Sequence, residues 1–233
     1  MPGWNETPLV GEGDWMSMYE GIEWRYDATG LYLRGLDQPL RTTGEPATCR
    51  AIIEVFEDIV INCAIQFNIP PELIVMTIAT EAAAYRRIGF TGPETFRWEQ
   101  HVRVTDVEPN HDGDYSLGPM QTLASTARWV IRRQNLDFDP FGVMPDLKQQ
   151  PVVPPDTLPG YEPEININIG TAEIKQRWHK TGDNPIFVSA CYNAGGLYSS
   201  NLNRWHLRSY GNHLDRAAEW FGDACFVINQ LRE

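Results

Sequence analysis

A single carboxylate ends a long apolar run, where a charge is costly to bury. The run is "IPPELIVMTIA", and it leads into "TEAAAYRR" with Glu81 as its acidic residue. On a helix that begins at Pro71, Glu81 falls on one stripe with Ile74 and Ile78. Burial on such a face raises the pKa of a carboxyl group. A carboxylic acid that keeps its proton near neutral pH is what a general acid requires, and cleavage of glycosidic bonds is a common use of one.

The same glutamate has a plainer interpretation. Glutamates near the end of a helix are usually solvated or paired with a basic neighbour, and Arg86 and Arg87 follow closely. This helix alone therefore leaves two alternatives for Glu81, a catalytic acid or a paired surface residue.

Glu81 needs a helix to hold it, and the spacing of apolar residues predicts several. The first helix begins at Thr48 as its N-cap, and its apolar residues are Ile52, Val55, Phe56, Ile59, Val60, Cys63 and Phe67. Asn68 ends this helix, and Pro71 opens the one that carries Glu81. Further helices are predicted at about 119–134, 164–180, 184–193 and 211–231. The predicted fold class is mostly α.

Two segments lack this helical periodicity. Residues 1–47 are rich in Gly, Trp and Tyr, and "IEWRYDATGLYLRG" predicts a short β-hairpin around Asp27 to Gly30. Residues 137–163 are rich in proline, which forbids a regular helix through most of the segment. We interpret residues 1–47 as an irregular extension packed on one helical domain, residues 48–233, and the proline-rich segment as a loop of that domain. The alternative for the loop is a linker between two domains.

Composition excludes some classes of function. The chain has 233 residues, 42% of them hydrophobic, which is enough for a sizeable core. Its formal charge is −12 and no Lys/Arg-rich block is present, which argues against nucleic acid as a partner. The start of the chain has no basic or apolar export segment, and no apolar run approaches the roughly 20 residues of a membrane span. We expect a protein made in the cytoplasm without a Sec signal.

The cysteines do not form a recognisable redox or metal pattern. They are widely spaced, without a CxxC pair: Cys49, Cys63, Cys191 and Cys225. We interpret them as reduced core residues, with a disulfide or metal set as the alternative.

Three further stretches follow Glu81 in a recognisable order. They are "SLGPMQ" at 116–121, "NINIGTAEI" at 166–174 and "ACYNAG" at 190–195. Together with the helix-borne glutamate they resemble the family of soluble lytic transglycosylases and goose-type lysozymes, whose pattern is Glu, then S-x-G-L-M-Q, N-I-x-x-G-x-x-Y-L and A-Y-N-A-G. The resemblance covers about residues 50–230. It implies a lysozyme-like α-helical fold that cleaves, without a cofactor, the β-1,4 bond between N-acetylmuramic acid and N-acetylglucosamine in peptidoglycan.

The resemblance also assigns roles to residues. Glu81 matches the catalytic acid, and Tyr192 matches the tyrosine that the family places beside it. The residues implied to bind the substrate are Ser116, Gly118, Met120, Gln121 and Asn193. Asn166 and Gly170 match the third motif, and for them we favour a structural role, in which the asparagine joins helices and the glycine permits close packing.

The chain departs from the family pattern at three positions. Ala82 stands where most transglycosylases have Ser, Pro119 replaces the motif leucine, and Glu173 replaces a tyrosine. None of these changes removes the acid. They place the chain on an outlying branch and leave the details of substrate contact open.

Two chemistries are compatible with this pattern. A lytic transglycosylase needs only Glu81, which protonates the leaving oxygen and then takes the proton of the muramyl C6 hydroxyl. An inverting hydrolase needs a second carboxylate to hold a water, roughly 6.5–9.5 Å from the acid. The one-carboxylate motifs match slightly better, so we favour the transglycosylase.

Three residues are candidates for the second carboxylate. Asp112 in "EPNHDGDYSLG" has the offset of an aspartate in goose-type lysozymes, and Asp114 is its neighbour. Glu99, in "FRWEQHV", is the third. The alternatives are an exposed turn for the aspartates and an ion pair of Glu99 with Arg97 or Arg103.

The aspartate-rich segment partly matches the pattern of a calcium-binding loop. Glu108, Asn110, Asp112 and Gly113 fit the first, third, fifth and sixth positions of an EF-hand. Pro119 then occupies the twelfth position, where a bidentate glutamate is required. We predict no metal site.

Delivery to the wall is the remaining question. Without an export segment, the sequence favours a phage-type lytic enzyme that reaches peptidoglycan through a holin, a virion or a partner protein. A competing class is a non-catalytic, lysozyme-like virion or wall-binding protein that uses its aromatic N-terminal segment as a contact surface. A binding module, however, has no need of a carboxylate on an apolar stripe.

Overall fold

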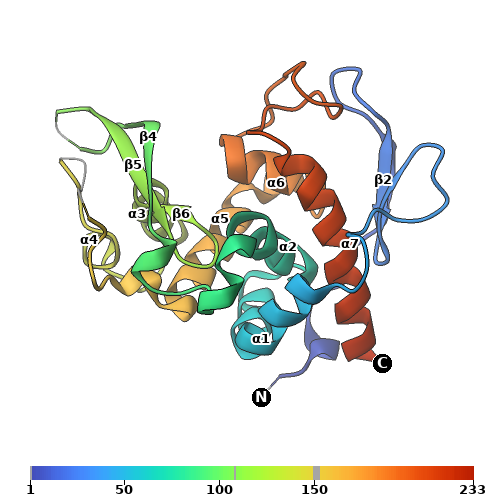
Figure 1. Cartoon of the computed structure of the whole chain (residues 1–233), viewed down its shortest axis with the longest axis horizontal. Helices are drawn as coiled ribbons and strands as arrows, with labels where there is room; N and C mark the ends of the chain where they lie inside the picture. Colours follow the sequence, from blue (N-terminus) through green and yellow to red (C-terminus); the bar gives the residue numbers. More distant parts are fainter. Residues whose placement is uncertain (1, 108, 149–152) are drawn as a thin grey trace. The chain divides into compact units, whose positions relative to one another are not determined.

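The fold is built from α-helices with two small antiparallel sheets (Figure 1). The computed structural model describes residues 2–107, 109–148 and 153–233. The α-helices are α1 (Ala47–Phe67), α2 (Pro71–Ala82), α3 (Ala124–Gln134), α4 (Pro140–Val143), α5 (Pro163–Thr181), α6 (Pro185–Ala194) and α7 (His213–Arg232). Short 3-10 helices are η1 (Trp4–Glu6), η2 (Ala83–Ile88), η3 (Pro93–Thr95) and η4 (Pro159–Tyr161). One sheet consists of β1 (Gly13–Met16), β2 (Trp24–Asp27) and β3 (Gly30–Leu33), and the other of β4 (Arg97–Val104), β5 (His111–Leu117) and β6 (Thr122–Leu123). The predicted mostly α fold class is confirmed.

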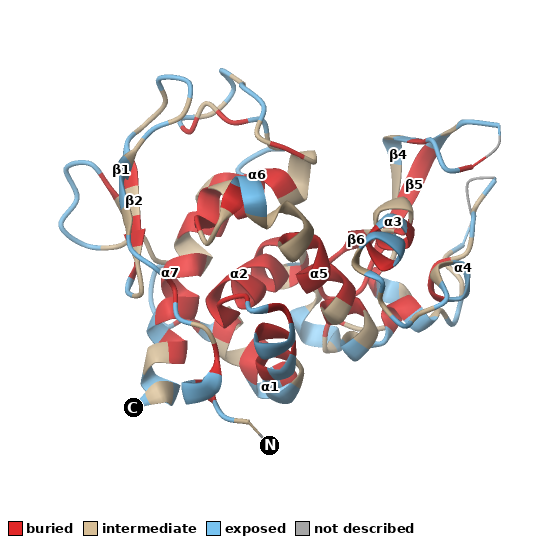
Figure 2. Cartoon of the chain, turned by 180° about the vertical axis from the view of Figure 1, so that it is seen from behind, coloured by how far each residue is buried: buried red, intermediate tan, exposed pale blue. Residues whose placement is uncertain are grey.

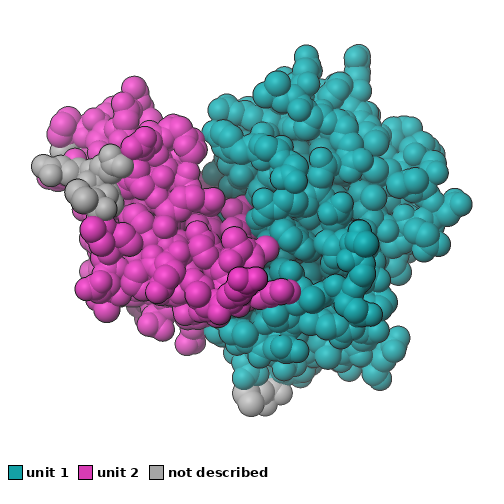
Figure 3. Space-filling model, viewed as in Figure 1, with its two compact units in different colours: residues 1–80, 177–233 teal, residues 81–176 magenta. Residues whose placement is uncertain are grey.

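The chain divides into two compact units (Figure 3). Unit 1 comprises Met1–Thr80 and Arg177–Glu233, and unit 2 comprises Glu81–Gln176. Unit 1 contains the N-terminal sheet with α1, α6 and α7. Unit 2 contains the second sheet with α3 and α4, and it begins at Glu81.

The predicted N-terminal hairpin is confirmed. Strands β2 and β3 pair in antiparallel register, from Trp24 opposite Leu33 to Asp27 opposite Gly30. Trp24, Tyr26, Leu31 and Leu33 are buried, and β3 lies against α7. Alternation of buried and half-buried residues along β2 is the period-two pattern of a strand with one face in the core.

Helix α1 follows the prediction with two corrections. Its N-cap residue is Pro46 rather than Thr48, so the first turn has no side-chain cap. Val55 is 53% exposed, whereas Ile52 and Phe56 are buried, because the buried stripe of the helix is narrower than its apolar pattern. Asn68 ends the helix in the left-handed conformation (φ 53°), as the sequence predicted.

The helix predicted at 119–134 begins only at Ala124. Gly118 and Gln121 both adopt positive φ angles, 77° and 46°. These left-handed residues bend the chain into a turn before β6 and delay the helix by five residues relative to the prediction.

The β4–β5 hairpin was missed by the sequence reasoning. Arg97 lies opposite Ser116, and Glu99 lies opposite Asp114. The interpretation of "HDGD" as an exposed turn is therefore wrong, because these residues belong to β5. Gly113 is required here, since a Cβ atom at this position would lie 2.5 Å from the indole ring of Trp98.

Many of the buried residues lie on the helices, most continuously along α2 (Figure 2). Residues 71–80 of α2 are all buried, in keeping with the apolar run that the sequence shows there. In unit 1, Trp24 packs edge-on against Trp205 and Phe187, with ring centroids 5.5 Å and 5.8 Å away. All four cysteines are buried and free, as predicted.

Candidate active site

Glu81 lies one residue before the end of α2, directly after the buried residues 71–80. Ile74 and Ile78, which share its stripe, have no exposed surface. Glu81 itself is half-buried, and its Oε1 atom is shielded from solvent. Arg86 and Arg87 follow in η2 and are exposed. The helix thus presents a carboxyl group at the edge of an apolar run.

The 116–121 segment is a tight turn fixed by its own side chains. The Gln121 amide donates to the backbone carbonyls of Thr95 (2.8 Å) and Gly118 (2.9 Å). Ser116 Oγ donates to Gln121 Oε1 (3.2 Å). Gln121 is only 5% exposed and Met120 is fully buried. These side chains hold the backbone of the turn in its shape.

Asn166 and Gly170 join α5 to the same turn. Asn166 Oδ1 accepts from the backbone N–H of Met120 (2.9 Å), and its Nδ2 donates to the carbonyl of Leu117 (2.9 Å). A Cβ atom at Gly170 would lie 2.4 Å from the sulfur of Met120, so only glycine permits this approach. The structural roles predicted for Asn166 and Gly170 are confirmed.

Glu99 is tied to the turn and to a base. Its side chain is 16% exposed, and Oε1 lies 2.6 Å from Arg97 Nε. Ser116 Oγ is 3.3 Å from Oε1 and can donate its single hydrogen there instead of to Gln121, and His101 Nε2 is 3.6 Å from Oε2. The ion pair with Arg97 was one of the two expected alternatives. Glu99, Ser116 and Gln121 thus form one continuous polar network.

The two aspartates of β5 have opposite environments. The side chain of Asp112 is 76% exposed and lies 3.4 Å from Arg103. Asp114 is 3% exposed, and its carboxylate accepts from the backbone N–H of Tyr115 (2.7 Å) and from both the backbone N–H and the hydroxyl of Ser125. Burial raises the pKa of Asp114, and the Ser125 hydrogen bonds only partly offset this effect.

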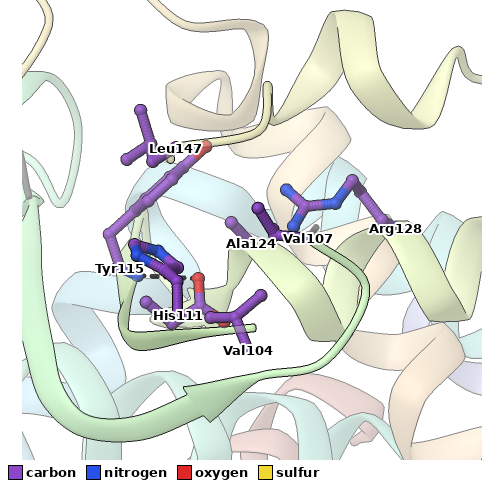
Figure 4. A pocket seen from close by; sticks show the side chains of 8 residues that line it. Val104, Val107, His111, Tyr115, Ala124, Arg128 and Leu147 are labelled. Atoms are coloured by element: carbon purple, nitrogen blue, oxygen red, sulfur yellow. Dashed lines mark hydrogen bonds between the residues drawn. The ribbon is translucent and has the colours of Figure 1, made fainter. Parts of the chain in front are cut away.

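A small pocket borders Asp114 (Figure 4). Its volume is about 10 Å³, roughly the room of one water molecule. His111, Tyr115, Arg128 and Leu147 contribute lining side chains, and Leu147 lies beside the ring of Tyr115. Arg128 is 1% exposed and pairs with Asp106 (3.0 Å), so its charge is already matched. A sugar ring does not fit in this pocket.

Tyr192 and Asn193 lie in unit 1, near the end of α6. Both are half-buried. Asn193 Oδ1 accepts from the backbone N–H of Tyr210 (2.9 Å), which ties the helix end to the segment before α7. Asn184 caps the start of α6 through the backbone N–H groups of Ile186 and Phe187. The position of Tyr192 is therefore fixed from both ends of a short helix.

Sequence reasoning missed some members of the network, and one predicted position cannot be placed. Thr95 accepts from the backbone N–H of Gly118 through its hydroxyl (3.0 Å) and from Gln121 through its carbonyl, although nothing in its sequence context marks it. Ser125, which holds Asp114, was also missed. Glu108, the first position of the calcium loop considered above, lies outside the described residues.

The comparison with family models decides the family. The transglycosylase SLT domain model matches residues 59–213, which is more than half of the chain. The chain belongs to this family. The SLT domain family comprises enzymes that cleave the glycan strands of peptidoglycan, and the lysozyme-like fold class expected from the motifs is confirmed. A search of curated proteins found no match.

The SLT domain match covers the candidate site residues described above. The matched residues extend from α1 to the first residue of α7 and include every predicted site residue from Glu81 to Asn193. Within the residues that the structure describes, no helix is long and apolar enough to span a bilayer.

Proposed function

We propose that this chain is a peptidoglycan lytic transglycosylase that uses Glu81 as both general acid and general base. The observation that carries the proposal is that each of the three candidates for a second carboxylate already contacts another side chain. Glu99 is paired with Arg97, Asp112 faces Arg103, and Asp114 is buried against Ser125. A hydrolase needs a carboxylate that can hold a water opposite the acid. A transglycosylase has no such requirement.

The reaction proceeds in two proton transfers. Glu81 donates its proton to the glycosidic oxygen while the bond from that oxygen to C1 of N-acetylmuramic acid breaks, and N-acetylglucosamine leaves with a free hydroxyl. The Glu81 carboxylate then takes the proton of the muramyl C6 hydroxyl, whose oxygen bonds to C1 and closes a 1,6-anhydro ring. Glu81 regains its proton, and no water is consumed. The shielded Oε1 atom and the match of Glu81 to the catalytic acid of the motif pattern support this role.

The products test the proposal directly. Purified peptidoglycan is digested with the wild type and with Glu81→Gln, and the fragments are analysed by mass spectrometry. We expect 1,6-anhydromuramyl ends, which are lighter by one water than reducing ends, from the wild type alone. Reducing ends from the wild type would overturn the transglycosylase, and equal digestion by Glu81→Gln would overturn the role of Glu81.

One observation favours a second candidate function, a goose-type inverting muramidase. Glu99 is the acid connected to the motif turn, through Ser116. In such a hydrolase Glu99, Asp112 or Asp114 would activate the attacking water. The variants Glu99→Gln, Asp112→Asn and Asp114→Asn separate the two functions. Loss of the water-activating base costs about 10²–10⁴-fold in rate. For a transglycosylase we expect Asp112→Asn to retain its activity.

We propose in addition a phage-type role, in which a virion or another delivery partner brings the enzyme to the wall. A net charge of −12 supports this, because it provides no attraction to an anionic wall. The competing, non-catalytic reading predicts that neither the wild type nor Glu81→Gln clears a suspension of purified sacculi, although both bind it. Clearing by the wild type alone supports the enzyme.

A further inference from the structure

An open groove lies in unit 1, and none of the residues assigned to the candidate active site lines it. Its volume is about 650 Å³. The lining comes from β3, from the segment that follows it, and from the C-terminal half of α7. Its lining includes two aromatic rings, one guanidinium group, three amides and one carboxylate, from Tyr32, Phe226, Arg41, Gln38, Asn229, Gln230 and Glu233.

The wall of this groove is fixed by close packing. Asp223 is 1% exposed and accepts from Arg41 Nε (3.1 Å) and from the hydroxyl of Thr42. A Cβ atom at Gly222 would lie 2.0 Å from the carbonyl oxygen of Leu40, so this segment rests directly on the backbone of α7. The Arg41 guanidinium lies over the Phe226 ring, 3.9 Å from its centroid. The groove is therefore formed before any ligand arrives, as binding sites usually are.

Its polar groups still have capacity for hydrogen bonds. Asn229 Nδ2 donates to the carbonyl of Ala28 (2.9 Å), which leaves its amide oxygen as an acceptor. Gln230 Oε1 accepts from Arg50 (3.0 Å), which leaves its amino group as a donor. Arg41 uses its Nε for Asp223, and within the described chain its terminal amino groups have no hydrogen-bond partner.

We propose that this groove is a second glycan-binding site, which holds a peptidoglycan strand while the candidate active site cleaves it. Sugar rings present apolar C–H faces, which pack on aromatic rings, and hydroxyl and acetamido groups, which pair with amides and guanidinium groups. Phe226 and Tyr32 supply the rings, and Arg41 can donate to hydroxyl and acetamido oxygens. The inference rests on the proposed function for the identity of the sugar. A second site on a polymeric substrate raises the effective concentration of the strand.

The test compares a groove variant with a matched control in the full chain. The groove variant is Phe226→Ala combined with Gln38→Ala, which leaves the Arg41–Asp223 pair in place. The control is Leu231→Ala, an exposed side chain on the same helix that does not line the groove. Two quantities are measured: co-sedimentation with glycan strands from which the stem peptides have been removed, and turnover of a short soluble glycan fragment.

We expect the groove variant to bind long strands about tenfold more weakly, which corresponds to ~1.4 kcal/mol. Its turnover of short fragments stays unchanged, and Leu231→Ala behaves like the wild type. Unchanged binding by the groove variant, or an equal loss in the control, overturns the proposal. A parallel loss of short-fragment turnover also overturns it, because the effect would then pass through the fold. If the wild type binds strands through the groove but cleaves nothing, the proposed function fails and the groove stands.

Discussion

Burial disfavours the ionised form of the Asp114 carboxyl group. Its pKa is raised from the ordinary value of 3.8, because desolvation outweighs the hydrogen bonds from Ser125 and Tyr115. Between pH 3.8 and the raised pKa of Asp114, the folded protein keeps a proton that the unfolded chain has lost. The folded state then binds more protons, so the free energy of unfolding falls as pH rises through this range.

Asp114→Asn removes this titration and tests the assignment. We expect the stability of the wild type, measured by urea denaturation and expressed relative to the variant, to decrease between about pH 4 and the folded pKa of Asp114. Asparagine has the same size and keeps one oxygen that can accept from Ser125, while the Tyr115 N–H loses its acceptor at every pH. Parallel pH profiles for the two proteins would show that burial does not shift this acid.

The hydroxyl of Tyr192 carries the second prediction at this scale. Tyr192→Phe keeps the ring that fills its half-buried position on α6 and removes only the oxygen. If Tyr192 acts on the reacting groups, turnover falls by about tenfold, the size of one hydrogen bond, and the melting temperature is nearly unchanged. Turnover on sacculi and thermal denaturation are measured together. A large drop in melting temperature at constant turnover would make Tyr192 a core residue.

Among the elements, the 116–121 turn depends on Gly118. Its φ of 77° favours glycine, and a Cβ atom there would lie 2.4 Å from the side chain of Asn166. Gly118→Ala should therefore displace Asn166 from Met120 and Leu117 and cost about 1–3 kcal/mol of unfolding free energy. Gly89→Ala is the control, because its φ of 74° is similar but its surroundings are open. We expect a clearly smaller loss for Gly89→Ala in urea denaturation, and equal losses would mean that backbone strain alone accounts for Gly118.

The helices could be predicted from the sequence because their apolar residues recur with the helical period. The pairing of β4 with β5 could not. Along β4 only Val104 is fully buried, so "RWEQHVRV" carries no alternation that distinguishes a strand from a loop. The motifs located Gln121 and Glu99, but not their burial or their shared contact with Ser116. Those features depend on the register of two strands, which no local pattern encodes.

At the scale of the whole molecule, charge governs the approach to the substrate. A chain with a net charge of −12 is repelled by the anionic carboxylates of peptidoglycan, and salt screens this repulsion. We therefore expect the initial rate of sacculus clearing to rise, at limiting substrate, as ionic strength increases from about 0.01 M to 0.15 M, where the Debye length falls from about 30 Å to 8 Å. Turnover of a short uncharged glycan fragment under the same conditions is the control and should stay constant. A clearing rate that falls with salt would instead indicate a local attractive contact strong enough to outweigh the net charge, and the arginines at the surface of β4, Arg97 and Arg103, would be the first to replace.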